Sequence, residues 1–205
     1  STVYLIEKRK ESLFRGAAYS STLEYEPLNV PVGKMSLYNS QPDDFYAWIL
    51  SNNLGDEEIT RDSFVSRRWF GNYLEENLKQ AVNHKHPAVN FNIIHSTTVD
   101  IDCPENYLLK QDDETEIEAH YVILATGNEK PNDVLSAEAR EVLGANYYSN
   151  PWHFNALENL QSEDTVLLIG TSLTSVDYLV SLKKRKHTGK VYALSLNGLL
   201  PKTHN

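Results

Sequence analysis

Hydrophobic and polar positions divide the chain into alternating strand-like and helix-like stretches. Short, partly β-branched apolar runs at residues 2–6, 121–127 and 165–169 are typical of strands buried on both faces. Residues 66–84 instead carry apolar side chains at three- and four-residue steps, which predicts a long amphipathic helix, and residues 172–186 predict another. Strands that alternate with helices predict an α/β protein with a mostly parallel sheet.

Weaker patterns predict the remaining elements. They are a loop at 13–38, a helix beginning at 43–44, strands at 89–101, within 106–126 and at 190–195, a turn at 112–114, and helices at 133–143 and 153–160. The loop is indicated by its glycine and proline residues, and the helix at 43–44 by acidic residues directly after Pro42.

The run Tyr-Val-Ile-Leu-Ala-Thr-Gly at 121–127 is predicted to be the strand around which the rest is organised. Ala125, Thr126 and Gly127 are small enough to let the backbone turn sharply and approach a ligand closely. An ordinary core strand followed by a glycine turn is the alternative.

Residues 165–177 predict a buried strand that turns directly into a helix. Such a turn presents the free N–H groups of the helix to the pyrophosphate of a dinucleotide. The glycine fingerprint is incomplete, because Gly170 holds its first position while Ser172 and Ser175 hold the other two. After the strand at 190–195 there is no acidic residue to bind the adenosine ribose of NAD and no arginine to bind the 2′-phosphate of NADP. A strand–helix turn that binds no ligand is therefore the alternative interpretation.

Composition narrows the classes of function. The chain has 205 residues, of which 40% are hydrophobic and 23% charged, and its net charge is −9. The chain has no stripe of basic residues that could neutralise phosphates, which argues against binding to nucleic acid or to an anionic membrane. Its one cluster of basic residues, at 183–186, lies at the carboxyl end of a predicted helix, where positive charges complement the helix dipole. No apolar run reaches membrane-spanning length. The single cysteine, Cys103, excludes an intramolecular disulfide and suits the cytoplasm.

Both ends of the chain lie close to strand-like sequence, so we expect a fragment of a longer polypeptide. Glu7 follows the run at 2–6, where an acid would take ribose hydroxyls in a Rossmann fold, although a surface glutamate after a strand is common. We expect no metal site, since His84 and His86 diverge and no cysteine or carboxylate completes a set with His95.

Several unusual stretches occur together and in order. They are Phe14-Arg15-Gly16-Ala17-Ala18-Tyr19, Leu28-Asn29-Val30-Pro31 running on to Ser36, Pro42-Asp43-Asp44-Phe45, Arg67-Arg68, Gly71-Asn72-Tyr73-Leu74, Leu124-Ala125-Thr126-Gly127-Asn128, Asn150-Pro151-Trp152 and Gly198-Leu199-Leu200-Pro201. In these the chain resembles, over nearly its whole length, the flavoprotein family labelled FAD-NAD(P)-binding, which is related to flavin-dependent N- and C-hydroxylases. It departs from that family in lacking an amino-terminal Gly-x-Gly-x-x-Gly turn and in having Ser172 where glycine is usual.

The resemblance implies cofactor-binding roles for particular residues. Glu7 would hold the adenosine ribose of FAD, and Val99 would meet the adenine through its backbone. The residues along the pyrophosphate and flavin would be Arg15, Gly16, Ala18, Tyr19, Asn29, Met35 and Ser36, with Thr126 and Gly127 closing the turn beside the flavin. Those facing NAD(P) would be Gly170, Thr171, Ser172, Leu173 and Thr174. Arg15 as a surface ion pair, Met35 as core filling and Asn29 as a turn residue are the alternatives.

The resemblance also implies a domain organisation and an activity. Residues 1–149 would form a Rossmann-like FAD-binding domain without its first strand and with a helical insertion at about 42–86. Residues 150–205 would begin a second, NAD(P)-binding domain. We expect an FAD-dependent oxidoreductase of hydroxylase type acting on a small-molecule substrate, in which this chain alone binds FAD poorly. The alternatives are a non-catalytic dinucleotide-binding protein and a flavin oxidase that does not use NAD(P)H.

Overall fold

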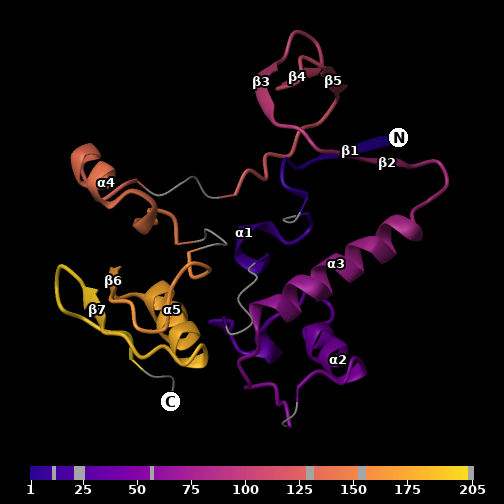
Figure 1. The fold of residues 1–205 in the computed structure, drawn as a ribbon. Coiled ribbons are helices and arrows are strands. Elements are labelled where there is room, and N and C mark those ends of the chain that lie inside the picture. The colour runs from indigo at the N-terminus through magenta and orange to yellow at the C-terminus, as the bar shows by residue number, and fades with distance from the viewer. Residues whose placement is uncertain (11–12, 21–25, 56–57, 128–131, 152–155, 203–205) are drawn as a thin grey trace. The chain divides into compact units, whose positions relative to one another are not determined.

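The computed structural model describes residues 1–10, 13–20, 26–55, 58–127, 132–151 and 156–202 (Figure 1). The helices are α1 (Gly16–Tyr19), η2 (Val32–Lys34), α2 (Asp44–Ser51), α3 (Arg67–Asn83), α4 (Ala137–Leu143), η3 (Gly144–Asn146) and α5 (Leu173–Lys184). The strands are β1 (Thr2–Ile6), β2 (Asn90–Ile94), β3 (Thr98–Asp102), β4 (Tyr107–Gln111), β5 (Glu116–Ala119), β6 (Val166–Ile169) and β7 (Val191–Leu194). These helices and small sheets are those of an α/β protein.

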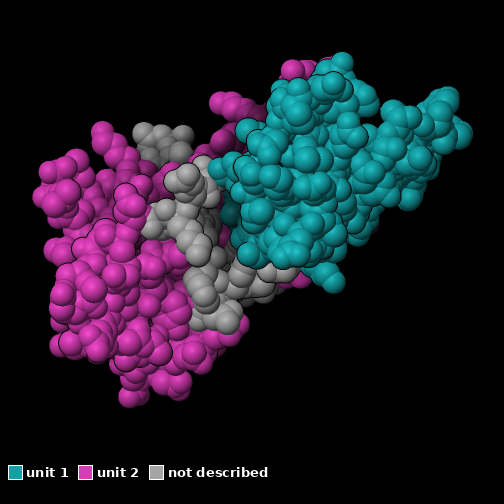
Figure 2. Space-filling model, turned by 90° about the horizontal axis from the view of Figure 1, so that it is seen from above, with its two compact units in different colours: residues 1–20, 70–128 teal, residues 21–69, 129–205 magenta. Residues whose placement is uncertain are grey.

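The chain divides into two compact units (Figure 2). Unit 1 comprises Ser1–Ser20 and Phe70–Asn128, and unit 2 comprises Ser21–Trp69 and Glu129–Asn205. Each unit is built from two stretches of chain, so neither coincides with the predicted domains 1–149 and 150–205. Those domains, and the Rossmann arrangement within them, stay predictions.

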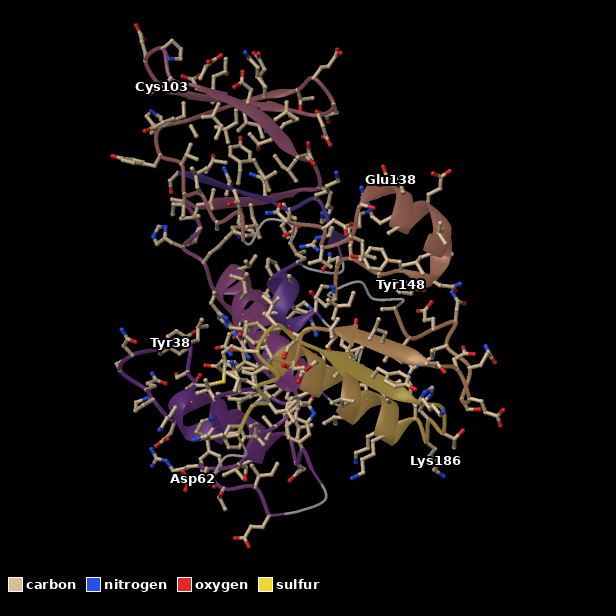
Figure 3. All side chains as sticks on the ribbon, turned by 90° about the vertical axis from the view of Figure 1, so that its left-hand side faces the viewer. Tyr38, Asp62, Cys103, Glu138, Tyr148 and Lys186 are labelled. Carbon is tan, nitrogen blue, oxygen red and sulfur yellow. The ribbon has the colours of Figure 1, made fainter. Side chains whose placement is uncertain are left out.

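Unit 1 holds a parallel strand pair and an antiparallel sheet. β1 pairs with β2 in continuous register, from Thr2 opposite Asn90 to Ile6 opposite Ile94. β3, β4 and β5 form an antiparallel meander whose second turn contains the predicted acidic residues 112–114. Cys103, a free and exposed thiol, directly follows β3 (Figure 3).

Helix α3 packs closely against α1 within unit 1. Phe70 and Tyr73 are buried on one helix face, and the ring of Phe70 meets that of Tyr19 edge-on at 4.8 Å between centroids. A Cβ at Gly71 would clash with the backbone carbonyl oxygen of Tyr19 and lie 3.2 Å from Nη1 of Arg15. Glycine therefore lets α1 approach the backbone of α3 directly.

Unit 2 has its core around α2. Phe45 and Ile49 lie four residues apart on this helix and are fully buried, as is Val32 of η2. Backbone hydrogen bonds join the strand-like segment before η2 to the residues before α3. They run from the N–H of Leu28 to Val65 O, from Val32 to Ser63 O, from Gly33 to Arg61 O and from Arg67 to Glu26 O. Farther along the chain, β6 pairs in parallel with β7.

Periodicity located most of the helices correctly. The helix predicted over 66–84 is α3, that over 172–186 is α5, and the start at 43–44 is that of α2. The helix predicted over 133–143 begins only at Ala137, where Ser136 accepts a capping hydrogen bond from the N–H of Ala139. The helix predicted over 153–160 is wrong for residues 156–160, which form turns, and its beginning lies outside the described residues.

Predictions about buried strands were less accurate. Residues 121–127 form no strand, and Tyr121 and Ile123 are about nine-tenths exposed, at 89% and 91%. The strand predicted over 89–101 is two strands, β2 and β3, which belong to different sheets. β1 and β6 occur where expected but are only partly buried. Instead of one mostly parallel sheet, the described residues form two parallel pairs and one antiparallel sheet.

Candidate functional site

The turn between β6 and α5 has the features of an anion-binding turn. The N–H of Gly170 donates to Leu194 O of β7 at 2.7 Å, which fixes the turn at the carboxyl end of the strand pair. Gly170 has φ +111°, and among the described residues only its chain neighbours come within 4 Å of the position that a Cβ would occupy. Among the first N–H groups of α5, that of Ser175 donates to Ser172 O at 2.9 Å, whereas those of Leu173 and Thr174 have no acceptor within the described residues. The side chain of the N-cap residue Ser172 caps none of them. The open space and the free donors fit a phosphate group.

The structure brings all five residues of the predicted NAD(P) turn together. The hydroxyl of Thr171 donates to Leu199 O at 2.5 Å, which attaches the Gly-Leu-Leu-Pro segment to this turn. Ser175 donates through its hydroxyl to Ser172 O at 2.7 Å and so closes the first turn of the helix. Leu173 is exposed and Thr174 is half-buried at the amino end of α5. The local geometry that the motif predicted is therefore present, apart from the serine at the second position.

Glu7 lies at the carboxyl end of β1, as expected for a ribose-binding acid. Its N–H continues the pairing with β2 by donating to Ile94 O at 3.0 Å. Its carboxylate accepts the backbone N–H of Arg9 at 3.0 Å, and its side chain remains 29% exposed. The carboxylate is thus oriented by a local turn and still has acceptor capacity for a hydroxyl pair.

Arg15 is engaged with α3. Its Nε donates to Glu75 Oε2 at 2.8 Å, its Nη2 donates to the same carboxylate, and Nη2 also donates to Asn72 Oδ1 at 2.8 Å. Lys79 contacts the other oxygen of Glu75, and hydrogen bonds from Lys79 and Arg15 lower the pKa of Glu75. The guanidinium therefore ties α1 to α3, and its predicted role at a pyrophosphate stays a prediction.

Replacing Arg15 by methionine is expected to lower the free energy of unfolding by about 1–3 kcal/mol, because a partly buried carboxylate loses charged hydrogen bonds. The loss should shrink as the pH falls through the titration of Glu75, since a carboxyl with a lowered pKa stabilises the fold only while it is ionised. Urea denaturation at neutral and acidic pH measures both effects. In the Glu75→Gln background the Arg15→Met substitution should cost less, and an equal cost there would contradict the pairing.

The other predicted residues of the amino-terminal segments are in α1 and in unit 2. Gly16 begins α1 with φ +61°, Ala18 is half-buried and Tyr19 packs on Phe70. In unit 2, Asn29 is exposed, Met35 ends η2 by donating its N–H to Val32 O at 3.1 Å, and the hydroxyl of Ser36 donates to Gln41 O at 2.7 Å. The predicted FAD-binding residues are thus distributed over both units.

Val99 occupies a β-bulge. Thr98 is opposite Gln111 and Asp100 is opposite Lys110, so Val99 is the extra residue of β3 and has no partner in the register. A bulged residue is left unpaired by the ladder. Sequence analysis placed Val99 in the strand after the long helix, whereas that strand is β2. The predicted contact of the Val99 backbone with adenine stays a prediction.

Thr126 and Gly127 lie in the exposed stretch 121–127. Gly127 has φ +70°, a conformation that favours glycine, and among the described residues only its chain neighbours come within 4 Å of the position that a Cβ would occupy. The predicted turn beside the flavin stays a prediction. It does not follow a strand in the described structure.

Sequence analysis missed a group of buried polar residues in unit 2. Glu26, Asp177 and Ser181 are 6%, 7% and 2% exposed. Glu26 Oε2, Arg67 Nε and Ser181 Oγ are buried and have no hydrogen-bond partner within the described parts of the chain. Burial raises the pKa of Asp177 to about 6, against the opposing effect of Arg67 and with a contribution from Glu26. The sequence did contain a signal for this group. Asp177 and Ser181 are four positions apart, so they lie on one face of the predicted helix 172–186.

The described residues contain neither a cluster of metal ligands nor a membrane-spanning helix. No group of three or more histidine, cysteine, aspartate or glutamate side chains is arranged to hold a metal ion in those residues. None of the helices resolved there is both long and apolar enough to cross a membrane.

Comparison with known proteins identifies the family. No curated protein matches the chain. A family model described as FAD-NAD(P)-binding matches residues 1–129, which include Glu7, the α1 segment, the meander and Gly127. This match covers more than half of the chain and supports a dinucleotide-binding oxidoreductase in general. The chain belongs to the FAD-NAD(P)-binding family.

Proposed function

We propose that the protein is an NAD(P)H-dependent flavoprotein oxidoreductase of hydroxylase type that acts on a small-molecule substrate. The observation that carries this proposal is the turn at Gly170, because it would supply a second place for a dinucleotide beyond the matched residues 1–129. An enzyme that binds one dinucleotide needs only one such place. Two places suit the transfer of electrons from a nicotinamide to a flavin.

The residues of this chain would bind and orient the two cofactors. In unit 1, the Glu7 carboxylate would accept hydrogen bonds from ribose hydroxyls, and the unpaired backbone at Val99 would meet the adenine. In unit 2, the free N–H groups at the start of α5 would bind the pyrophosphate of NAD(P)H beside Gly170. The flavin, when bound, supplies the redox chemistry, while the protein supplies position and excludes water.

Replacing Ser172 by aspartate is expected to weaken NADPH binding by about tenfold or more, because a carboxylate at the N-cap repels the pyrophosphate. Aspartate is itself a favoured N-cap residue, so the helix should form as well as before. Ser172→Asn is the matched control, since asparagine also caps helices but adds no charge. Isothermal titration with NADPH measures the affinity, and equal affinities of the two variants would contradict binding at this turn.

The Ser172 side chain favours a second function, that of a flavin enzyme that does not use NAD(P)H. Its Cβ and hydroxyl occupy the position at which a pyrophosphate approaches most closely when glycine is present. Adding FAD, removing the unbound excess and recording the visible spectrum tests flavin binding. Loss of the flavin colour on anaerobic addition of NADPH supports the first function, and flavin that keeps its colour supports the second. Binding of neither nucleotide would overturn both.

A further inference from the structure

A cavity of about 280 Å³ lies at the carboxyl end of α5, within unit 2. Its volume is close to the lower limit of ligand pockets, which measure about 300–1,000 Å³. Two leucines form the apolar part of its lining, and the other residues carry polar groups. The lining consists of Leu160, Gln161, Ser162, Leu182, Arg185 and His187. Apolar walls with a few polar groups are the usual composition of a small-molecule site.

Backbone contacts hold the two walls of this cavity together. The carbonyl oxygen of Ser162 accepts the N–H groups of Thr188 at 2.7 Å and of Gly189 at 3.0 Å, as well as the hydroxyl of Thr188 at 3.0 Å. A Cβ at Gly189 would lie only 2.0 Å from Asp164 O, so the chain after α5 lies directly against the turn before β6. The cavity is therefore preformed, which lowers the entropic cost of binding a ligand.

The end of α5 brings His187 to the cavity. The N–H of Lys186 donates to Lys183 O and that of His187 donates to Leu182 O, both at 3.0 Å, and these two hydrogen bonds define a Schellman motif. Lys186 has the left-handed conformation that the motif requires, with φ +57°, at a position where glycine is usual (Figure 3). The motif returns residue 187 to the side of the buried Leu182, and both residues line the cavity.

Two side chains of the lining have unused hydrogen-bonding groups. Nε2 of His187 is buried and has no hydrogen-bond partner within the described chain. Nη1 of Arg185 donates to Leu157 O at 2.7 Å, which anchors the guanidinium and leaves its other N–H groups available. A buried polar atom without a partner is costly, and a ligand that satisfies it removes this cost. The unused groups therefore indicate a ligand with hydrogen-bond acceptors.

The charge at this end of α5 is strongly positive. Residues 183–186 are four consecutive exposed cations, whereas the carboxyl end of a helix carries only about half an elementary negative charge. The lining of the cavity contains no carboxylate. In the adjacent turn, Asp164 is already engaged, because its Oδ2 accepts the N–H of Gln161 at 2.8 Å. The excess of positive charge favours an anionic ligand.

We propose that this cavity binds a small organic monocarboxylate, an anion with an apolar body. Its carboxylate would accept hydrogen bonds from the Arg185 guanidinium and from Nε2 of His187. Its apolar body would lie against Leu160 and Leu182, where a purely polar anion would leave leucine surface in contact with water. Because α5 has 12 residues, about 18 Å of helix separates this site from the turn at Gly170. The site is therefore distinct from the proposed dinucleotide turn.

Isothermal titration of the full chain with sodium benzoate tests the proposal, and inorganic phosphate is the comparison anion. Benzoate should bind at one site and about tenfold or more tightly than phosphate, because only benzoate buries apolar surface. His187→Leu and Arg185→Gln should each weaken benzoate binding by about tenfold or more, since each removes a hydrogen bond to a charged group.

Lys183→Gln is the matched control for these two variants. It removes one positive charge from the same cluster, at an exposed position outside the lining, so salt-screened attraction alone should change the affinity by less than about threefold. Three results would overturn the proposal: no binding of benzoate, equal binding of phosphate, or a benzoate affinity that neither His187→Leu nor Arg185→Gln lowers. If Arg185→Gln does not fold after losing its bond to Leu157, His187→Leu still decides the question.

Urea denaturation separates ligand binding from a structural role of His187. Without benzoate, the midpoint of His187→Leu should equal or exceed that of the wild type, because a buried nitrogen without a partner is removed. Benzoate should raise the midpoint of the wild type and not that of His187→Leu. His187→Gln should restore part of the affinity, since its amide again offers an N–H donor. A lower midpoint of His187→Leu without benzoate would mean that the imidazole already has a partner, contrary to the proposal.

Competition with NADPH distinguishes this site from the proposed function. NADPH should leave the affinity for benzoate unchanged whether or not the dinucleotide itself binds. Displacement of benzoate by NADPH would instead assign benzoate to the dinucleotide turn and would refute the separate site. The benzoate experiments need no flavin or nicotinamide, so their failure and the failure of the proposed function can be told apart.

Discussion

Replacing Ile49 by alanine is expected to destabilise unit 2 by about 2–5 kcal/mol, the cost of emptying a fully buried aliphatic site. Ile49 is 0% exposed on α2, beside the equally buried Phe45. Alanine has a higher helix propensity than isoleucine, so the change in propensity alone would raise the free energy of unfolding and cannot explain the predicted decrease. Urea denaturation followed by tryptophan fluorescence suits this measurement, because Trp48 lies in the same helix and its ring is stacked on Phe45 at 6.1 Å between centroids.

The neighbouring residue provides the control for this substitution. Leu50 follows Ile49 in α2 but is 52% exposed. Leu50→Ala removes the same number of carbon atoms from the same helix, and its effect should stay within about 0.5 kcal/mol, as for most surface substitutions. Equal losses for the two variants would mean that α2 does not bury the face containing Phe45 and Ile49.

Replacing Gly71 by alanine should destabilise unit 1, although alanine favours helices by about 1 kcal/mol over glycine. The new methyl group would clash with the carbonyl oxygen of Tyr19, which is backbone and cannot rotate away. Overpacking typically costs about 1–3 kcal/mol, and here it must exceed the gain in propensity. The added methyl group also lies against Arg15, so the contact of its guanidinium with Glu75 should weaken as well.

The sign of the change makes this second experiment decisive. If α1 does not pack on α3 at this point, Gly71→Ala should raise the free energy of unfolding by the difference in propensity. Gln80→Ala, on the exposed side of α3, reports how the helix responds to alanine without a clash, and little change is expected there. Chemical denaturation of both variants beside the wild type measures the two effects.

Helices could be predicted from the sequence because their signals are local. The apolar steps through Trp69, Tyr73 and Leu74 locate α3, and Asp43-Asp44 after Pro42 locates the start of α2. The turn at Gly170 was also predictable, because it depends on a single glycine between a strand and a helix. In each case the sequence signal lies within a short stretch of chain, although the turn at Gly170 is also held by hydrogen bonds to Leu194 and Leu199.

Features set by distant residues could not be predicted in this way. An apolar run such as 121–127 indicates a strand only if another strand is available to pair with it, and none pairs with it in the described structure. The bulge at Val99 depends on the register of β4, and the pKa of Asp177 responds to the charges of Arg67 and Glu26, more than a hundred residues earlier. No local pattern encodes these partners.

The parallel pairing of β1 with β2 has a consequence for synthesis on the ribosome. The pairing runs from Thr2 opposite Asn90 to Ile6 opposite Ile94, so β1 must wait for a partner that is made nearly ninety residues later. At translation rates of about 5–20 residues per second, this delay amounts to roughly 5–20 seconds. The backbone bonds between Leu28 and Val65 can close earlier, within the segment that separates the two halves of unit 1. The order of emergence therefore favours formation of this inserted segment before the strand pair, although β1 precedes the segment in the sequence.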